Sequence, residues 1–275
     1  VSVSALATNL QSETIHSTIG LFANDKKVKS QSIEIKSGDS KEVFFDLTPE
    51  AGNYHLRIEN SDIISLQVFK YKELDLKKQK LHTYISPKAK PAEVTVAQKK
   101  NRYSITASGW DFYHAEDAYG AVYLKQLEGD FVSTVKIESF ANRTNQWFRA
   151  GLFVRNDMSE SFDVTRGSKG SVLMFSTPGR AGINYDEFGD GCMHKADSEN
   201  LPEDTPTPIW VRLERHGDRF TGYISLDGEN WMIKRQTKSI PGINKAIDVG
   251  LAAGSSDQVQ YFVDFAEWKV LVEEN

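Results

Sequence analysis

Three strand-like stretches of the sequence place aromatic residues and arginines at alternate positions. Their candidate binding residues are Trp147, Arg149, Arg155, Trp210, Arg212 and Tyr223. An aromatic ring can pack against the apolar face of a pyranose, and the planar arginine fork can bind hydroxyl, carboxylate or sulfate groups of a sugar. These residue types therefore indicate carbohydrate binding. The alternative is structural: the tryptophans would fill gaps, and the arginines would pair with Glu214 or other surface carboxylates.

A second group of candidate residues is acidic. The stretch 186–191 is similar to the start of a calcium-binding loop. Phe188 occupies the third ligand position, however, and the twelfth is Asp197 rather than a bidentate glutamate, so an EF-hand is not expected. Asp186, Asp190 and Asp197 could still hold calcium together with backbone carbonyls. The alternative is a merely solvated acidic loop.

The composition is that of a globular protein without a strong electrostatic field. The 275 residues include 39% hydrophobic and 26% charged residues, and the net charge is -5. This length favours two medium domains over one. The negative charge and the lack of basic residues interleaved with aromatic ones argue against nucleic acid as a partner, and no apolar run is long enough for a membrane span. Cys192 is the single cysteine, so an intramolecular disulfide is impossible.

Short alternating or β-branched runs between Gly, Asn, Asp and Pro clusters predict an all-β protein. No stretch sustains the spacing of an amphipathic helix. The clearest predicted strands are 18–22, 31–35, 41–47, 52–58, 64–69, 131–137, 148–155, 172–176, 210–215, 220–226 and 259–268. Residues 70–92 are rich in Lys and Glu and contain Pro87 and Pro91, so they are predicted to form a linker.

The N-terminal residues 1–69 resemble a known family in the order of three stretches. Leu21–Val28, Ile35–Phe45 and Gly52–Ile58 follow one another as the strand, turn-strand and strand of the bacterial immunoglobulin-like domains known as CARDB. The resemblance implies an immunoglobulin-like sandwich, and modules of this type usually serve as spacers.

The C-terminal residues 93–275 carry a second resemblance. Its motifs are Tyr103–Gly109, Ala115–Tyr123, Leu127–Phe131, Trp147–Arg155, Trp210–Arg215, Ser225–Trp231, Val249–Ser255 and Phe262–Phe265. In this order they resemble the concanavalin A-like lectin/glucanase sandwiches that occur as appended modules of secreted bacterial proteins. The resemblance implies a jelly-roll sandwich. The chain departs from the family at Asp111–His114 and in the long acidic loop 186–208.

Alternation within the predicted strands separates a core face from a polar face. Phe148 and Leu152 would face the core, whereas Trp147, Arg149 and Arg155 would point to the other side; in 210–215, Trp210 and Arg212 would do the same. We expect Trp147, Arg149, Arg155 and Arg212 to share one ligand face. The surplus of arginine there favours an acidic polysaccharide.

Catalysis has little support in the sequence. Glycosidases with a concanavalin A-like fold typically carry paired carboxylates as Glu-x-Asp-x-x-Glu, and the one similar start, Glu73–Asp75, continues to Lys78. Two motifs faintly similar to those of polysaccharide lyases occur in reversed order, without an intervening Gln-x-His. Cys192 and His194 lie two residues apart, but zinc prefers four ligands and no second such pair is near in sequence.

The sequence therefore predicts a non-catalytic carbohydrate-binding region of a secreted, periplasmic or cell-surface bacterial protein, with calcium as the one conceivable cofactor. The start at Val1 suggests a processed product or a piece of a larger multidomain protein. The runner-up is a structural or adhesive surface module that binds a protein. A lyase or glycosidase on a jelly-roll fold comes third.

Overall fold

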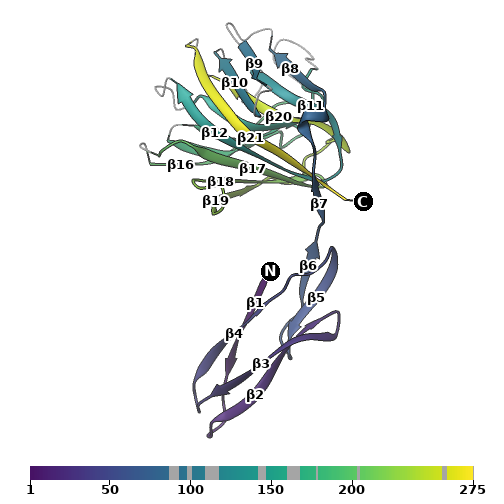
Figure 1. The fold of residues 1–275 in the computed structure, drawn as a ribbon, viewed down its shortest axis with the longest axis vertical. Coiled ribbons are helices and arrows are strands. Elements are labelled where there is room, and N and C mark those ends of the chain that lie inside the picture. Colours follow the sequence, from purple (N-terminus) through teal and green to yellow (C-terminus); the bar gives the residue numbers. More distant parts are fainter. Residues whose placement is uncertain are drawn as a thin grey trace. The chain divides into compact units, whose positions relative to one another are not determined.

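The computed structural model describes residues 1–86, 93–97, 101–108, 118–141, 147–159, 168–177, 179–202, 205–255 and 259–274; for residues 93–97, 141, 233 and 234 it describes the backbone only. Apart from the short 3-10 helix η1 (Leu76–Lys78), the regular structure of these residues is β-strand, so the predicted all-β class is confirmed. They divide into two compact units whose main segments are Val1–Lys70 and Tyr71–Glu273 (Figure 1). In this described part of the chain, no helix has the length and apolar character needed to cross a membrane.

The first unit contains two antiparallel sheets. Its strands are β1 (Ser2–Thr8), β2 (Ile15–Ala23), β3 (Lys26–Ile35), β4 (Ser40–Asp46), β5 (Gly52–Ile58) and β6 (Ile64–Val68). One sheet pairs β1 with β4, and the other has the order β3-β2-β5-β6. Alternate side chains of each strand point inward. They form a core of Val3, Leu21, Ile33, Ile35, Val43, Phe45, Leu56 and Ile58. The immunoglobulin-like class of this unit remains a prediction.

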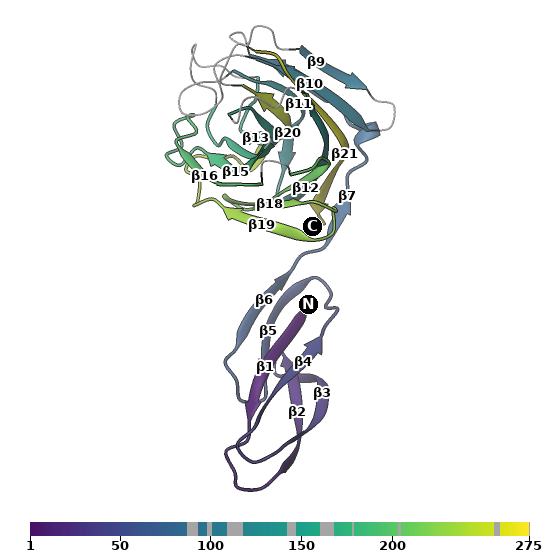
Figure 2. The same ribbon diagram turned by 90° about the vertical axis from the view of Figure 1, so that its left-hand side faces the viewer.

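The second unit is a larger sandwich of two sheets (Figure 2). Its strands are β7 (Tyr71–Glu73), β8 (Leu81–Ile85), β9 (Glu93–Ala97), β10 (Arg102–Ala107), β11 (Gly120–Glu128), β12 (Phe131–Ala141), β13 (Arg149–Arg155), β14 (Val172–Thr177), β15 (Arg180–Tyr185), β16 (Lys195–Asn200), β17 (Ile209–His216), β18 (Arg219–Ser225), β19 (Trp231–Gln236), β20 (Ala246–Gly254) and β21 (Tyr261–Glu273). One sheet has the order β19-β18-β17-β12-β21-β10-β9, with β7 also paired to β21. The other has the order β16-β15-β14-β13-β20-β11-β8.

The main core of the second unit lies between these two sheets. On β17, Val211 and Leu213 are fully buried and alternate with half-buried polar side chains, which is the pattern of a strand with one face inward. The two sheets meet closely at Gly222 of β18. A Cβ atom at this position would lie 2.3 Å from the Sδ atom of Met174 on β14, so only glycine fits without a shift of the methionine.

The predicted linker at residues 70–92 is wrong for residues 71–85. β7 pairs with β21 and β8 pairs with β11, so this segment adds a strand to each sheet. Leu74, Leu76 and Leu81 pack against the main core. The exposed lysines between these leucines hid the apolar positions from the sequence interpretation. Residues 87–92 lie outside the described residues.

The sheet that contains β13 is covered on both faces at its strands β13 and β14. Its inner side faces the main core, and its outer side carries a second apolar cluster. That cluster includes Phe153, Leu173, Phe175, Met158 and Met193. As a result every residue of β13 and β14 is buried. The near-continuous apolar runs of these two strands are typical of strands that are covered on both sides.

Candidate functional site

The outer face of the sheet that contains β17 carries a group of aromatic and charged side chains. Strands β17, β18 and β19 lie side by side (Figure 1), and their register places Trp210 and Trp231 opposite Ser225, with Arg212 opposite Tyr223 in the next row. Glu214 follows two residues after Arg212 on the same face. We name the group of Trp210, Arg212, Glu214, Tyr223 and Trp231 the β17–β19 surface. Each of its side chains is half-buried.

Contacts within the β17–β19 surface hold its polar groups in place. The guanidinium carbon of Arg212 lies 4.0 Å from the ring centroid of Trp231, a cation–π contact. The Arg212 Nη1 atom lies 3.6 Å from the Glu214 carboxylate, and the Tyr223 hydroxyl donates a hydrogen bond of 3.2 Å to the same carboxylate. The ring of Tyr223 meets that of Trp231 edge to face, with centroids 6.5 Å apart. The surface is therefore ordered before any ligand arrives.

The second indole, Trp210, is supported from both sides along the sheet. The Lys136 ammonium lies 5.2 Å from the centroid of its ring. Gly228, in the turn between β18 and β19, has a φ of 81°, and a Cβ atom there would lie 3.0 Å from the indole. The turn is shaped by Asp227, whose carboxylate accepts hydrogen bonds from the backbone N–H groups of Glu229 and Asn230. The turn thus fixes the position of Trp210.

Tyr223 is tuned to remain a hydrogen-bond donor. Burial raises the pKa of its phenol to about 12, and the negative charge of Glu214 adds to the effect. Both causes disfavour the phenolate. Tyr223 therefore keeps its proton throughout the physiological range.

The structure separates the sequence-predicted binding residues into two groups. Trp210, Arg212 and Tyr223 lie together on the β17–β19 surface, whereas Trp147, Arg149 and Arg155 belong to the other sheet or precede its strand β13. The expectation that Trp147, Arg149, Arg155 and Arg212 share one face is wrong. Alternation shows which residues of a strand share a side, but it does not show to which sheet the strand belongs.

Arg149 and Arg155 are also buried, with 4% and 2% exposure. The Arg155 Nε atom donates a 2.6 Å hydrogen bond to Ser171, and its guanidinium lies over the rings of Tyr119 and Phe153. The Arg149 guanidinium lies 5.7 Å from the centroid of the Phe175 ring. These arginines stabilise the outer side of the buried sheet. Of this group only Trp147 is exposed, at 44%, and its ring stacks with the guanidinium of Arg180 at 4.6 Å.

Comparison with solved structures gives matches to the sandwich. A functionally unknown protein from Saccharomyces cerevisiae matches with a TM-score of 0.51 and 15% identity, over 71% of this chain and 97% of that one. Arcelin-5, a lectin-like defense protein from Phaseolus vulgaris, matches with a TM-score of 0.46 and 12% identity, over 72% of this chain and 93% of that one. The exoplasmic/lumenal domain of VIP36 bound to calcium and Man3GlcNAc matches with a TM-score of 0.41 and 10% identity, over 69% of this chain and 87% of that one.

These similarities concern the fold. The yeast protein shares the fold over 71% of this chain, and the solved structures that match also include a lectin-like defense protein and a domain bound to calcium and Man3GlcNAc. No protein-family model matches the sequence. No curated protein matches it either. The function must therefore be argued from the side chains of this chain.

The acidic loop between β15 and β16 is built around Asp186, which is fully buried. One carboxylate oxygen of Asp186 accepts hydrogen bonds from the backbone N–H groups of Gly189 and Asp190, at 2.7 and 3.1 Å. The other oxygen accepts from Gly191 and Gly170, at 3.0 and 3.2 Å. Asp186 is therefore an internal anchor of the loop.

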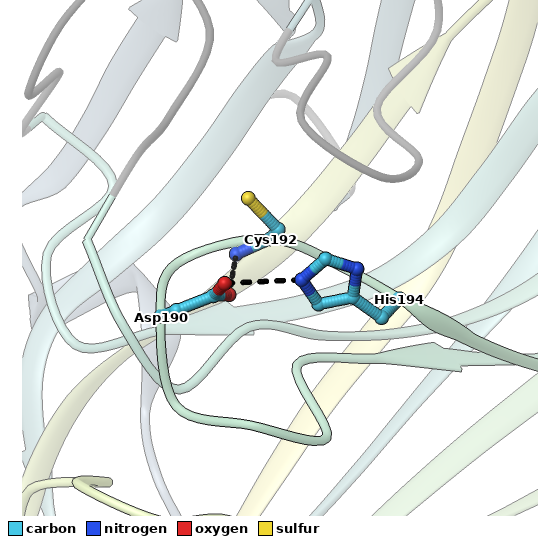
Figure 3. A group of neighbouring side chains, drawn as sticks. All are labelled: Asp190, Cys192 and His194. Atoms are coloured by element: carbon cyan, nitrogen blue, oxygen red, sulfur yellow. Dashed lines mark hydrogen bonds and ion pairs between the residues drawn. The ribbon is translucent and has the colours of Figure 1, made fainter.

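The predicted calcium ligands Asp186, Asp190 and Asp197 do not form one site. The oxygens of Asp186 are occupied by backbone donors, and Asp197 lies within β16, where it forms an ion pair of 3.1 Å with Arg235 of β19. Among the residues that the structure describes, the group of potential metal ligands brought together is Asp190, Cys192 and His194 (Figure 3). Sequence spacing showed Cys192 and His194, but it did not show that the chain turns back to bring Asp190 beside them.

The sequence interpretation also missed two members of the β17–β19 surface, Glu214 as a site residue and Trp231. The signal for Trp231 was present in the turn Asp227–Asn230, which predicts a hairpin between the strands on either side. In such a hairpin Trp231 follows the turn directly and lies opposite Ser225, on the same face as Tyr223. The signal for Glu214 was its spacing of two from Arg212.

Proposed function

We propose that the second unit binds carbohydrate through the β17–β19 surface. The observation that carries this proposal is the combination, on one outer sheet face, of two half-buried indoles with a guanidinium, a phenol and a carboxylate that are already in contact. Indoles present apolar area to the C–H face of a sugar ring, and the polar groups offer fixed donors and acceptors to its hydroxyls. Because the groups are ordered in advance, a ligand loses less free energy to their immobilisation.

The spacing of the indoles fits a chain of sugars better than a single one. Trp210 and Trp231 lie on β17 and β19, with β18 between them. Neighbouring strands are about 4.8 Å apart, so the two backbones are separated by roughly 10 Å. The two rings could then contact different sugar units of one oligosaccharide. Arg212, Tyr223 and Glu214 would bind the hydroxyl groups next to them.

The charges of this surface favour a neutral glycan over an acidic one. Arg212 is paired with Glu214, and the neighbouring Lys136 lies 3.2 Å from Glu138 and 3.4 Å from Glu267. The prediction of an acidic polysaccharide depended on four residues of one face, and two of them, Arg149 and Arg155, are buried on the other sheet. Without them the cations of this face are balanced by carboxylates. A strong loss of affinity at high salt would instead indicate an acidic glycan, because salt screens charge–charge interactions.

The wider setting of the protein follows from its sequence resemblances. We propose that it acts outside the cytoplasm as an accessory region of a bacterial polysaccharide-active or cell-surface protein, with the first unit as a spacer. The proposed role of the second unit is binding rather than catalysis.

The experiment is a glycan array with the full chain, followed by calorimetric titration of the best oligosaccharide. We expect Trp231→Ala and Trp210→Ala each to weaken binding by about tenfold or more, because removal of a buried aromatic contact from a binding site commonly costs over 1 kcal/mol. The matched control is Trp147→Ala, which removes an exposed indole on the other sheet and should leave the affinity unchanged. Binding that depends on Trp147 and not on Trp231 would refute the proposed site.

A protein-binding role is the second candidate, and one observation in the first unit favours it. Leu6 of β1 and Phe44 of β4 lie on the outer face of the two-stranded sheet, with 69% and 58% exposure. Exposed apolar side chains that adjoin one another can mark an interaction surface. If this candidate is correct, no glycan on the array binds, and Phe44→Ser abolishes capture of the protein partner.

A further inference from the structure

We infer that Asp190, Cys192 and His194 form a binding site for Zn²⁺ or a similar transition-metal ion. The three residues occupy alternate positions in the segment that joins β15 to β16, and each offers one ligand atom of a different kind (Figure 3). A carboxylate oxygen, a thiolate sulfur and an imidazole nitrogen are the three protein donors that zinc uses. This site lies on the sheet opposite the β17–β19 surface, so it is independent of the proposed sugar site.

The ligand atoms are close to the separation that a metal ion requires. All three lie within 4.8 Å of one another, and the Asp190 Oδ2 and His194 Nε2 atoms are 3.1 Å apart. Zinc bonds of about 2.0 to 2.3 Å in a tetrahedral arrangement place neighbouring ligand atoms roughly 3.3 to 3.7 Å apart. Small side-chain rotations are therefore enough to close the three donors around one ion.

The loop that carries these residues is fixed by contacts that do not involve the proposed metal. Asp186 accepts the backbone hydrogen bonds described above, including those from Asp190 and Gly191. The backbone N–H of Cys192 donates to Asp190 Oδ1 at 3.0 Å, which orients the carboxylate so that Oδ2 faces His194. Gly189 packs so closely that a Cβ atom there would lie 2.2 Å from the Pro241 carbonyl oxygen. A preformed loop lowers the free-energy cost of assembling the site.

The donor set favours a borderline-soft cation over calcium. Calcium takes six to eight oxygen ligands, whereas thiolate and imidazole select zinc and other transition metals. Bound as thiolate and carboxylate, Cys192 and Asp190 contribute two negative charges, which balance the charge of a divalent ion. The neutral imidazole of His194 adds the third bond.

The burial of the residues gives the ion a path and an open side. Cys192 is buried, whereas the side chains of Asp190 and His194 keep 37% and 31% of their exposure. Three protein ligands leave a fourth tetrahedral position for water or another donor. Phe188, whose ring centroid is 5.1 Å from that of His194 and whose side chain is exposed, lies beside the site on the same loop.

The test is a titration of the metal-free full chain with Co²⁺, which replaces zinc and reports thiolate ligation by an intense near-ultraviolet charge-transfer band. Because the chain has one cysteine, the band can arise from Cys192 alone. We expect saturation at one ion per chain, displacement by Zn²⁺, and loss of the band in Cys192→Ser. Asp190→Asn and His194→Asn should weaken Co²⁺ binding by at least about tenfold, since even groups that only orient metal ligands cost 10- to 100-fold.

The matched control is His216→Asn. His216 also lies beside a carboxylate, that of Asp130 at 3.6 Å, but at the end of β17 in the other sheet, and its replacement should leave Co²⁺ binding unchanged. A second readout needs no variant. In a low concentration of urea, which lets the reagent reach the buried thiol, Zn²⁺ should slow alkylation of Cys192 and Ca²⁺ should not. Absence of the thiolate band, equal alkylation with and without Zn²⁺, or a band that survives intact in His194→Asn would each overturn the site.

Discussion

Replacing Asp186 by asparagine tests whether this buried carboxylate is a structural anchor. The substitution keeps the shape of the side chain but exchanges one acceptor oxygen for an NH2 group, so two of the four backbone N–H donors of Gly170, Gly189, Asp190 and Gly191 lose their acceptor. Hydrogen bonds to a charged group are worth about 1.5 to 3 kcal/mol each, which sets the loss at roughly 3 to 6 kcal/mol. Removal of a buried charge returns part of this, so we expect a net destabilisation of about 3 kcal/mol.

The assay is urea unfolding followed by tryptophan fluorescence. All five tryptophans lie in the sequence between residues 71 and 273, the range of the second unit, so the signal reports this unit; they are Trp110, Trp147, Trp210, Trp231 and Trp268. The matched control is Asp197→Asn, which breaks a half-exposed ion pair with Arg235 and should cost no more than about 1 kcal/mol. Equal stability of the two variants, or a loss in Asp186→Asn that appears in calcium alone, would refute the anchor role.

Three further predictions concern single side chains of the second unit. Tyr223 should titrate near pH 12 in ultraviolet absorbance. Because its pKa is raised above the ordinary value of 10.0, its contribution to stability is present below pH 10 and is lost between pH 10 and 12. In Glu214→Gln the phenol should titrate at lower pH. Arg155→Lys should lower the unfolding free energy by about 2 kcal/mol, since lysine cannot reproduce a buried arginine fork, while glycan affinity stays unchanged. Gly151→Ala should destabilise the second unit by about 3 kcal/mol or prevent its folding, because the added Cβ atom would lie 2.0 Å from the Met174 carbonyl oxygen. Unfolding midpoints that match the parent protein would contradict the predictions for Arg155→Lys and Gly151→Ala.

The strands were predictable from the sequence because alternation is a local signal. The predicted strands 210–215 and 220–226 correspond to β17 and β18, and the parity that places Trp210, Arg212 and Tyr223 on one face is also local. The same local rule grouped Arg149 and Arg155 correctly with each other. It could not show that their side of β13 is covered by a second apolar cluster, because that cover comes from residues far away in the sequence.

The errors at the linker and at the acidic loop have a similar cause. Charged residues dominate the segment that contains Leu74 and Leu76. These leucines pack against the main core and line a cavity with Tyr103 of β10 and Trp268 of β21, which are distant in sequence. In the loop, the sequence alone does not distinguish the role of Asp186 from that of Asp190. Backbone N–H groups of the turn surround the Asp186 carboxylate, whereas the Asp190 carboxylate lies beside Cys192 and His194. This difference depends on the turn geometry around Gly189 and Gly191.

The most direct test of the proposed sugar site is an NMR titration of the indole N–H signals with an oligosaccharide from the glycan array. Trp210 and Trp231 lie on the β17–β19 surface, Trp147 is exposed on the other sheet, and Trp268 is buried in the core, so the indoles report separately on the possible faces. We predict that the signals of Trp210 and Trp231 shift together and saturate at the same ligand concentration, while those of Trp147 and Trp268 stay in place. A shift of the Trp147 signal alone, with Trp210 and Trp231 unchanged, would contradict it.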